Sequence, residues 1–172
     1  MKFVLAALLL GVSVLAQAQQ AGLRAACGAE KASFKVELDG TQHTPAAPEP
    51  GKAQVYILRD DGVLGGPDDI GYPTIKIGMD GTWVGANEGN SWFVFSVEPG
   101  EHGMCASVQS GLDIGHILEF AHFTAEAGKT YYFRTRFTIT KRQAYLNFDP
   151  ADSDQGKYMI AAFPLSTWRA KK

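Results

Sequence analysis

Two pairs of aspartates form the densest group of chemically capable side chains in this sequence. They stand within D-D-G-V-L-G-G-P-D-D, as Asp60, Asp61, Asp68 and Asp69. Carboxylate oxygens are the ligands that calcium prefers, and it takes about six to eight of them. The spacing differs from the D-x-[DN]-x-[DN]-G pattern of calcium loops, so we predict a solvated loop with no metal or other cofactor. Because exposed loops on a rigid scaffold often carry binding, these aspartates mark the predicted binding loop.

The histidines are the next candidates for metal binding or proton transfer. They are His43, His102, His116 and His122. A zinc site needs about three or four converging nitrogen, sulfur or oxygen ligands, and the spacing of His116 and His122 matches no metal motif. We therefore predict structural histidines, with the His102 ring bonded to the backbone of the turn at Pro99 and Gly100.

A serine, an aspartate and a histidine also lie close together in the sequence, as Ser110, Asp113 and His116. A catalytic triad is recognised by its geometry, and closeness in sequence is poor evidence for one. The chain has no G-x-S-x-G nucleophile elbow. We predict that the protein is not an enzyme and has no catalytic residues; an unrecognised hydrolase is the least favoured alternative.

Three tryptophans are candidates for a surface that stacks on sugars. They are Trp83, Trp92 and Trp168. Packing in a hairpin or in the core explains Trp83 and Trp92 at least as well, because buried aromatic rings contribute strongly to packing.

The overall composition narrows the class of protein. The net charge is −2, and basic residues are scattered among acidic ones. Nucleic-acid-binding domains usually carry a basic patch, so we predict no nucleic-acid partner. The 19 glycines and 8 prolines stand mostly between apolar runs, which is typical of a turn-rich β protein.

Residues 1–18 have the three parts of a secretory signal peptide. Lys2 precedes an uncharged run over residues 3–15, and Ala16-Gln17-Ala18 forms the cleavage site. The run is shorter than the roughly 18 apolar residues of a membrane-spanning helix. We predict cleavage after Ala18 and a periplasmic or secreted protein without a transmembrane segment after cleavage.

The two cysteines, Cys27 and Cys105, follow from this prediction. A lipoprotein is disfavoured because Arg24 stands three residues before Cys27, where a lipobox has an apolar side chain. An even number of cysteines in an exported chain favours a disulfide. A reactive thiol lacks support, because there is no C-x-x-C motif and no histidine next to Cys27. We predict a bridge that joins the N-terminal segment to the strand holding Cys105.

Alternating apolar and polar residues predict a mainly β protein: an antiparallel β-sandwich with a short C-terminal helix. We expect an N-terminal segment and linker over residues 19–51, with one strand at 32–38, and a sandwich domain over residues 52–172. The strands of this domain are predicted at 53–59, 74–79, 82–85, 91–97, 102–108, 117–124, 130–140 and 144–148.

Several local contacts are also predicted. Asp80-Gly81 predicts a two-residue type I′ hairpin in which Ile77 lies opposite Val84. Arg134 and Arg136 are expected to face water. A helix over residues 155–163 should begin at Asp152 or Ser153 as N-cap. It should bury Tyr158, Ile160 and either Ala161 or Ala162.

Four sequence elements occur in order between Lys52 and Phe133. They are A-x-V-Y from Ala53, x-D-G at Asp80-Gly81, P-G-x-H from Pro99 and A-G-K-T-Y-Y from Ala127. This run resembles an uncharacterised family of bacterial envelope proteins, catalogued as a domain of unknown function. It is also similar to PEGA-type and carboxypeptidase-regulatory-like modules, which are accessory sandwiches without catalysis.

The resemblance implies a small envelope β-sandwich, a fold often found in lipoproteins, and it carries no known active residues. This chain departs from the family pattern in lacking a good lipobox and in its long acidic loop at residues 60–69. The function favoured at this point is a non-enzymatic module that binds a partner protein or an envelope component. The main alternative is a module that binds a small ligand, metal or glycan through the Asp60–Asp69 loop.

Overall fold

Short alternating segments build ten strands and one helix in the part of the chain that the structure describes. This structure is a computed structural model, and it describes residues 27–28, 32–42, 44, 48–61, 73–109, 117–139 and 143–171. The predicted signal peptide lies outside these residues. None of the helices in the described ranges is long and apolar enough to cross a membrane.

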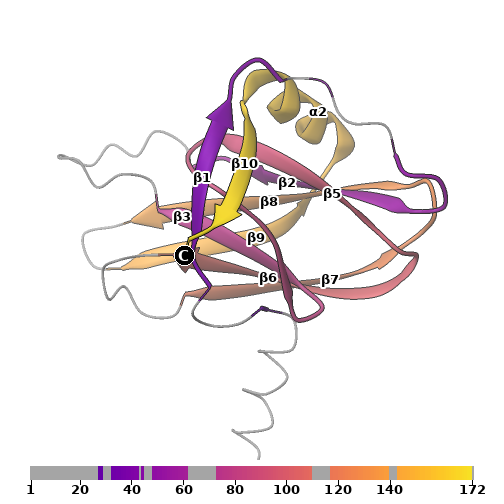
Figure 1. Ribbon diagram of the computed structural model, residues 1–172, viewed down its shortest axis with the longest axis horizontal. Helices are drawn as coiled ribbons and strands as arrows, with labels where there is room; N and C mark the ends of the chain where they lie inside the picture. The colour runs from indigo at the N-terminus through magenta and orange to yellow at the C-terminus, as the bar shows by residue number, and fades with distance from the viewer. Residues whose placement is uncertain are drawn as a thin grey trace, which may run out of the picture.

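The strands form two sheets, as Figure 1 shows. The larger sheet has the order β1-β10-β5-β2-β8-β9, and the smaller has the order β4-β3-β6-β7. The strands are β1 Phe34–Asp39, β2 Ala53–Arg59, β3 Thr74–Met79, β4 Thr82–Asn87, β5 Ser91–Val97, β6 Gly100–Gln109, β7 Leu118–Ala125, β8 Thr130–Ile139, β9 Ala144–Ala151 and β10 Leu165–Ala170. The predicted mainly β fold with a short C-terminal helix is confirmed, but the pairs β2–β8 and β10–β5 are parallel rather than antiparallel as predicted.

Strand β2 is the centre of the larger sheet, and every residue in it is buried. Val55 and Ile57 face the core between the sheets, where they join Ile75 and Ile77 of β3. The opposite face of β2 is covered by the helix. This double coverage explains why A-Q-V-Y-I-L-R reads as a nearly continuous apolar run rather than a strict alternation.

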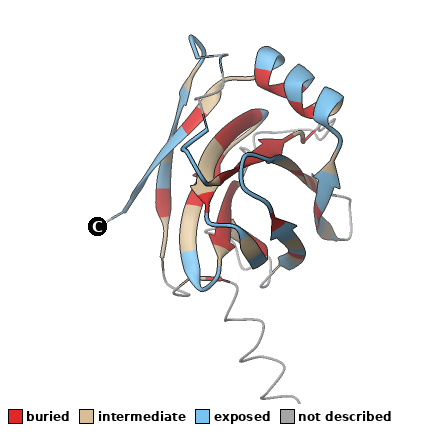
Figure 2. Cartoon of the chain, turned by 90° about the vertical axis from the view of Figure 1, so that its right-hand side faces the viewer, coloured by how far each residue is buried: buried red, intermediate tan, exposed pale blue. Residues whose placement is uncertain are grey.

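Helix α2, Ser153–Ala162, lies on the outer face of the larger sheet. The Asp152 side chain caps it by accepting hydrogen bonds from two backbone N–H groups of the first turn, as predicted. Gly156, Met159 and Ile160 are its buried residues. The predicted burial of Tyr158 was wrong. This side chain is 71% exposed, because it lies on the side of the helix turned away from the sheet. Ala161 and Ala162 are exposed as well. Figure 2 shows the exposed outer side of the helix.

The hairpin between β3 and β4 has the predicted turn but a different register. Asp80 and Gly81 have φ angles of 48° and 82°, as a type I′ turn requires. A register shift next to Gly78 then places Ile77 opposite Gly85, so the predicted pairing of Ile77 with Val84 was wrong. A side chain at position 85 would overlap the Phe93 ring, and the shift puts the residue without a side chain at this contact.

The arm, formed by β1 and β10, stands upright across the other strands in Figure 1. Strand β10 was not predicted, because L-S-T-W-R-A is mostly exposed and lacks the pattern of a core strand. A single pair, Leu165 with Trp92, joins the arm to β5. Most of the arm is exposed (Figure 2).

The predicted disulfide is confirmed by the geometry of Cys27 and Cys105, whose Cα atoms are 5.6 Å apart. It fixes the segment before β1 to strand β6. Gly28 follows directly and packs against the indole of Trp83, where a Cβ atom would overlap the ring. The Lys76 ammonium group lies 4.4 Å from the centre of that same indole ring and donates a hydrogen bond to the Ala32 carbonyl oxygen.

The helix contact yields a test of the packing. Gly156→Ala should lower the free energy of unfolding by about 1–2 kcal/mol, because a Cβ atom at this position overlaps the Tyr132 ring. In an open helix the same change stabilises by up to about 1 kcal/mol. Urea unfolding of this variant and of Lys157→Ala, the exposed neighbour, measures the difference. A stabilised Gly156→Ala protein would contradict the close contact.

Candidate binding site at the carboxyl end of strand β2

A buried arginine ends strand β2 and bonds to two other segments of the chain. The Arg59 side chain is fully buried. Its Nη1 atom donates to the carbonyl oxygens of Pro73 at 2.5 Å and Asn87 at 3.0 Å. Its Nη2 atom lies 2.5 Å from Oδ2 of Asp61. That last contact lacks the angles of a hydrogen bond, so it is an ion pair without directional bonding.

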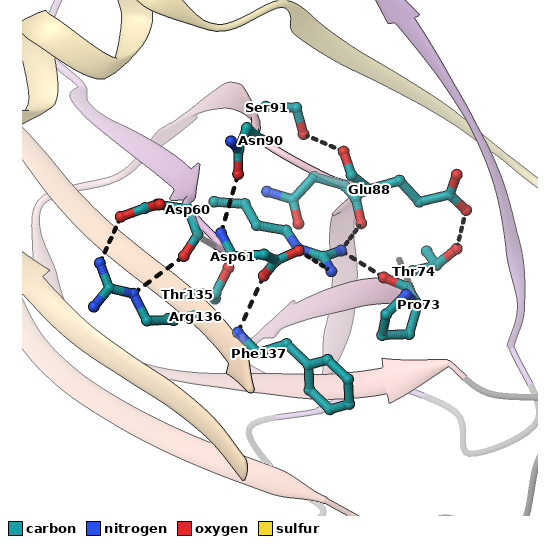
Figure 3. Close-up of polar contacts among 12 residues, drawn as sticks. Asp60, Asp61, Pro73, Thr74, Glu88, Asn90, Ser91, Thr135, Arg136 and Phe137 are labelled. Carbon is teal, nitrogen blue, oxygen red and sulfur yellow. Dashed lines mark hydrogen bonds and ion pairs between the residues drawn. The ribbon is translucent and has the colours of Figure 1, made fainter. Parts of the chain in front are cut away.

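Asp61 is buried with Arg59 and links it to strand β8. Its Oδ1 atom accepts a hydrogen bond of 3.1 Å from the Phe137 backbone N–H. Its own N–H donates to Oδ1 of Asn90 at 3.0 Å. Figure 3 shows how these contacts converge on Asp61 from different strands. The residue is therefore held from three directions: by Arg59, two residues earlier, and by Phe137 and Asn90, which are far away in the sequence.

Asp60 makes a second, more exposed ion pair beside the buried one. Its Oδ2 atom lies 2.6 Å from Nη2 of Arg136, whose side chain is 42% exposed. The Arg136 Nε atom donates to the Asp60 carbonyl oxygen at 3.2 Å, and the Asp60 N–H donates to the Thr135 carbonyl oxygen. Arg136 was predicted to face water; its side chain is partly exposed, as predicted, but it also pairs with Asp60.

We call this group the Arg59 cluster: Arg59, Asp60, Asp61, Asn87, Asn90 and Arg136. Two arginines face two aspartates, so the charges balance in pairs. The turn between β4 and β5 is also tied to the start of β3, because the Glu88 carboxylate accepts a hydrogen bond from the Thr74 hydroxyl group. Ser91 closes the same turn by donating to the Glu88 carbonyl oxygen at 3.0 Å.

Asn87 is the uncharged member of the cluster with unused bonding capacity; over the described residues, Arg59 Nε and Nη2 and Asp61 Oδ2 also lack hydrogen-bond partners. Its side chain is fully buried, and neither its Nδ2 nor its Oδ1 atom has a hydrogen-bond partner in the described part of the chain. Buried polar groups are nearly always bonded, and an unpaired one costs about 1–3 kcal/mol. Asn87 therefore combines a donor and an acceptor that a bound polar molecule could satisfy.

Half of the predicted binding loop lies in this cluster. Asp60 and Asp61 are each paired with an arginine, which leaves their carboxylates poorly suited to calcium. Asp68 and Asp69 lie outside the described residues, as do Ser110, Asp113 and the histidines at 43 and 116. His122 is exposed on β7. Over the described ranges, no three histidine, cysteine, aspartate or glutamate side chains come together as metal ligands.

The three tryptophans do not share one face. Trp92 is buried in contact with Tyr56 and the helix, and its Nε1 atom donates to the Phe163 carbonyl oxygen. Trp83 and Trp168 both contact the Phe34 ring edge-to-face. Burial, with the nearby Tyr132, raises the pKa of Tyr56 to about 12, so the Tyr56 hydroxyl group stays protonated at physiological pH.

A shallow depression of about 240 Å³ lies beside strands β7, β8 and β9. Aromatic and apolar side chains make up most of its lining, chiefly His122, Phe123, Tyr131, Tyr132, Phe133 and Pro150. The Tyr131 hydroxyl group already accepts a hydrogen bond from the Glu126 N–H. Ligand pockets usually measure about 300 Å³ or more, so the depression is the weaker candidate.

His102 joins two turns at the other end of the sandwich. Its Nδ1 atom lies 2.6 Å from Oδ2 of Asp80, and its Nε2 atom lies 2.8 Å from the Glu98 carbonyl oxygen. The predicted ring–backbone bond is therefore present. Both ring nitrogens face acceptors, so the arrangement favours the imidazolium form, which donates from both. The Gly103 N–H donates to the other Asp80 carboxylate oxygen at 3.0 Å.

Opposing effects set the pKa of each partner in this pair. Burial lowers the pKa of His102, but the hydrogen bonds to Asp80 and Glu98 and the Asp80 charge outweigh it and raise the pKa above 6.5. Burial raises the pKa of Asp80, but the hydrogen bonds from His102 and Gly103 outweigh it and lower the pKa below 3.8. Both groups are therefore charged between these values.

No family model, curated protein or solved structure matches this chain. The resemblance to envelope sandwich modules therefore stays a prediction, and only the geometry of the site indicates what it can bind.

Removing the Asp61 charge tests the buried pair. Asp61→Asn should lower the free energy of unfolding by about 3 kcal/mol, because it leaves the Arg59 charge buried and unpaired. Asp60→Asn is the matched control; it breaks a partly exposed pair and should cost about 1 kcal/mol or less. Urea unfolding at neutral pH measures both. Equal losses in the two variants would contradict a special role for Asp61.

The His102–Asp80 pair predicts a pH-dependent stability. His102 contributes fully below pH 6.5, and the contribution is lost as the pH rises through its raised folded-state pKa. Asp80 contributes above pH 3.8, and that contribution is lost as the pH falls through its lowered folded-state pKa. The difference in unfolding free energy between the native protein and His102→Gln should therefore be larger at pH 5 than at pH 9. A difference that does not shrink at pH 9 would show that the pair is uncharged.

Proposed function

We propose that this protein is an exported, non-enzymatic β-sandwich module that binds a partner protein or an envelope component. The proposed binding surface is the loop end of the sandwich, which we define as the end where β2 stops and β3 begins. The observation that supports it is the Arg59 cluster, which anchors the segments that enter and leave this end.

The loop end differs from the opposite end of the molecule. The opposite end, or turn end, has tight turns at residues 49–52, 80–81, 98–99 and 126–129, several with positive φ angles. At the loop end the turn at 88–90 joins β4 to β5, and six other strand ends lie there: Arg59, Thr74, Gln109, Leu118, Ile139 and Ala144. Sandwich modules commonly bind through the connections at one end, because the sheets hold the strand ends rigid.

The cluster supplies this rigidity at a cost in stability. A buried charge pair stabilises a fold poorly compared with apolar packing, because both charges lose their hydration. The Asp61 contacts to Phe137 and Asn90, and the Arg59 contacts to Pro73 and Asn87, hold four segments in one arrangement. Because the strand ends are already fixed, a partner that binds them loses less free energy to the ordering of this surface.

A small-ligand, metal or glycan module acting through the Asp60–Asp69 loop is the second candidate. Asn87 is the observation that favours it, since it offers a buried amide without a protein partner over the described residues. Calorimetric titration with calcium, zinc and cell-wall sugars tests this candidate. Heat of binding that disappears in Asn87→Ala would favour it over a protein partner.

Site-specific photo-crosslinking tests the proposed surface. Tyr145, near the start of β9 at the loop end, is 47% exposed, so a photoreactive phenylalanine analogue can replace it with little change in shape. In intact cells, this variant should give a discrete crosslinked species that an excess of unmodified protein removes.

Tyr158 provides the matched control, because it is an exposed tyrosine on the helix, away from the loop end. The same analogue at position 158 should give no such species. Identical products from both positions, or none from position 145, would reject the loop end as the binding surface.

A further inference from the structure

Strand β1 has one edge that is only partly bonded. The Lys171 N–H donates to the Ser33 carbonyl oxygen, which fixes the phase of the β1–β10 pairing. In an antiparallel pair, alternate residues direct their backbone groups toward the partner. Lys35, Glu37 and Asp39 therefore bond to β10, and the backbone groups of Phe34, Val36 and Leu38 point away from it.

The Gln109 side chain closes one end of this outer edge. Its Oε1 atom accepts from the Phe34 N–H at 2.6 Å, and its Nε2 atom donates to the Phe34 carbonyl oxygen at 2.8 Å. One side chain thus replaces a neighbouring strand at Phe34. For Val36 and Leu38, no partner of their outward N–H and C=O groups lies in the described part of the chain.

The two faces of the arm differ in character at this edge. Leu38 is 50% exposed and Trp168 is 39% exposed, on the face shared with Val36. The other face of β1 carries Lys35, Glu37 and Asp39 in alternation. An exposed edge with apolar side chains pairs readily with another strand unless charges or bulges oppose it.

We propose that β1 pairs with β1 of a second copy of this chain in an antiparallel arrangement, with Val36 of each copy opposite Leu38 of the other. This register uses the outward backbone groups of both residues in both copies and gives four hydrogen bonds across the two-fold axis. Gly40 of each copy would follow next, opposite Phe34 of the other. The outward groups of Phe34 already bond the Gln109 side chain, so the pairing between copies ends at Val36 and Leu38.

The charges of β1 are complementary to themselves in this register. Lys35 of each copy lies opposite Asp39 of the other, so two opposite-charge pairs form on the polar face. Glu37 lies opposite Glu37 on the two-fold axis, which opposes association. Lys35 at 3.2 Å and Arg169 at 3.8 Å reduce this repulsion within each arm. A strand of unrelated sequence would place opposite charges against Lys35 and Asp39 only by chance, so the second copy is the favoured occupant.

Sedimentation equilibrium of the oxidised protein over a range of concentrations tests the pairing. The native protein should dimerise reversibly. Lys35→Glu should weaken association about tenfold or more, because it reverses both ion pairs, and Glu37→Gln should tighten it about threefold by removing the like-charge pair. Val36→Pro should abolish the dimer, because it removes an outward N–H without breaking a β1–β10 bond.

Two controls keep the outcome interpretable. Tyr158→Ser changes an exposed aromatic residue away from the arm and should leave association unchanged. Hydrogen exchange should show the Val36 and Leu38 amides protected at high protein concentration and unprotected at low concentration. A protein that stays monomeric overturns the proposal, as does a dimer that Lys35→Glu does not affect. Weaker association of Glu37→Gln would overturn the register, and amide protection only upon adding cell envelope would assign the edge to a different protein.

Discussion

A buried guanidinium group imposes the strictest bonding requirement in this molecule. Arg59 ends a strand enclosed between two neighbours, and its charge has no access to water. Such a charge is tolerated only with a counter-charge and hydrogen-bond acceptors at close range. Asp61 supplies the counter-charge, and the Pro73 and Asn87 carbonyl oxygens are the acceptors, so this one side chain ties the start of β3 to the end of β4. The arrangement at the loop end depends on this one requirement.

Local features of the fold could be predicted because their physical cause is local. The Asp80-Gly81 turn needs positive φ at both positions, and Asp152 supplies the acceptor that a helix start lacks. Strand partners could not be predicted in the same way. The turn at Glu98-Pro99 looks like a hairpin, yet it carries the chain from the larger sheet to the smaller one. Turn chemistry determines the reversal of the chain but leaves open which strand the next segment will pair with.

The candidate site shows the same division. Its aspartates were evident from composition, but their partners were not, because Asp60 and Arg136 are 76 residues apart. The alternation in β8 assigned Arg136 to water, and Phe133 and Phe137, on the opposite face of the strand, do lie in the core. It could not show that an aspartate from the end of β2 lies beside that arginine. Asn87 gave no signal at all, since its importance comes from its lack of a partner in the folded chain.

The bridge between Cys27 and Cys105 also changes the path by which the arm can close. Strands β1 and β10 lie near opposite ends of the described chain, so their pairing encloses nearly all of the sandwich. With the bridge formed, the shortest covalent route between the two strands passes through the sulfur atoms and is roughly half as long as the route along the backbone. This shorter route lowers the entropic cost of bringing the two strands together by only about 0.6 kcal/mol. The bridge also fixes the segment before β1 to β6, so the strand on which the end of the chain pairs is held by a covalent bond as well as by packing.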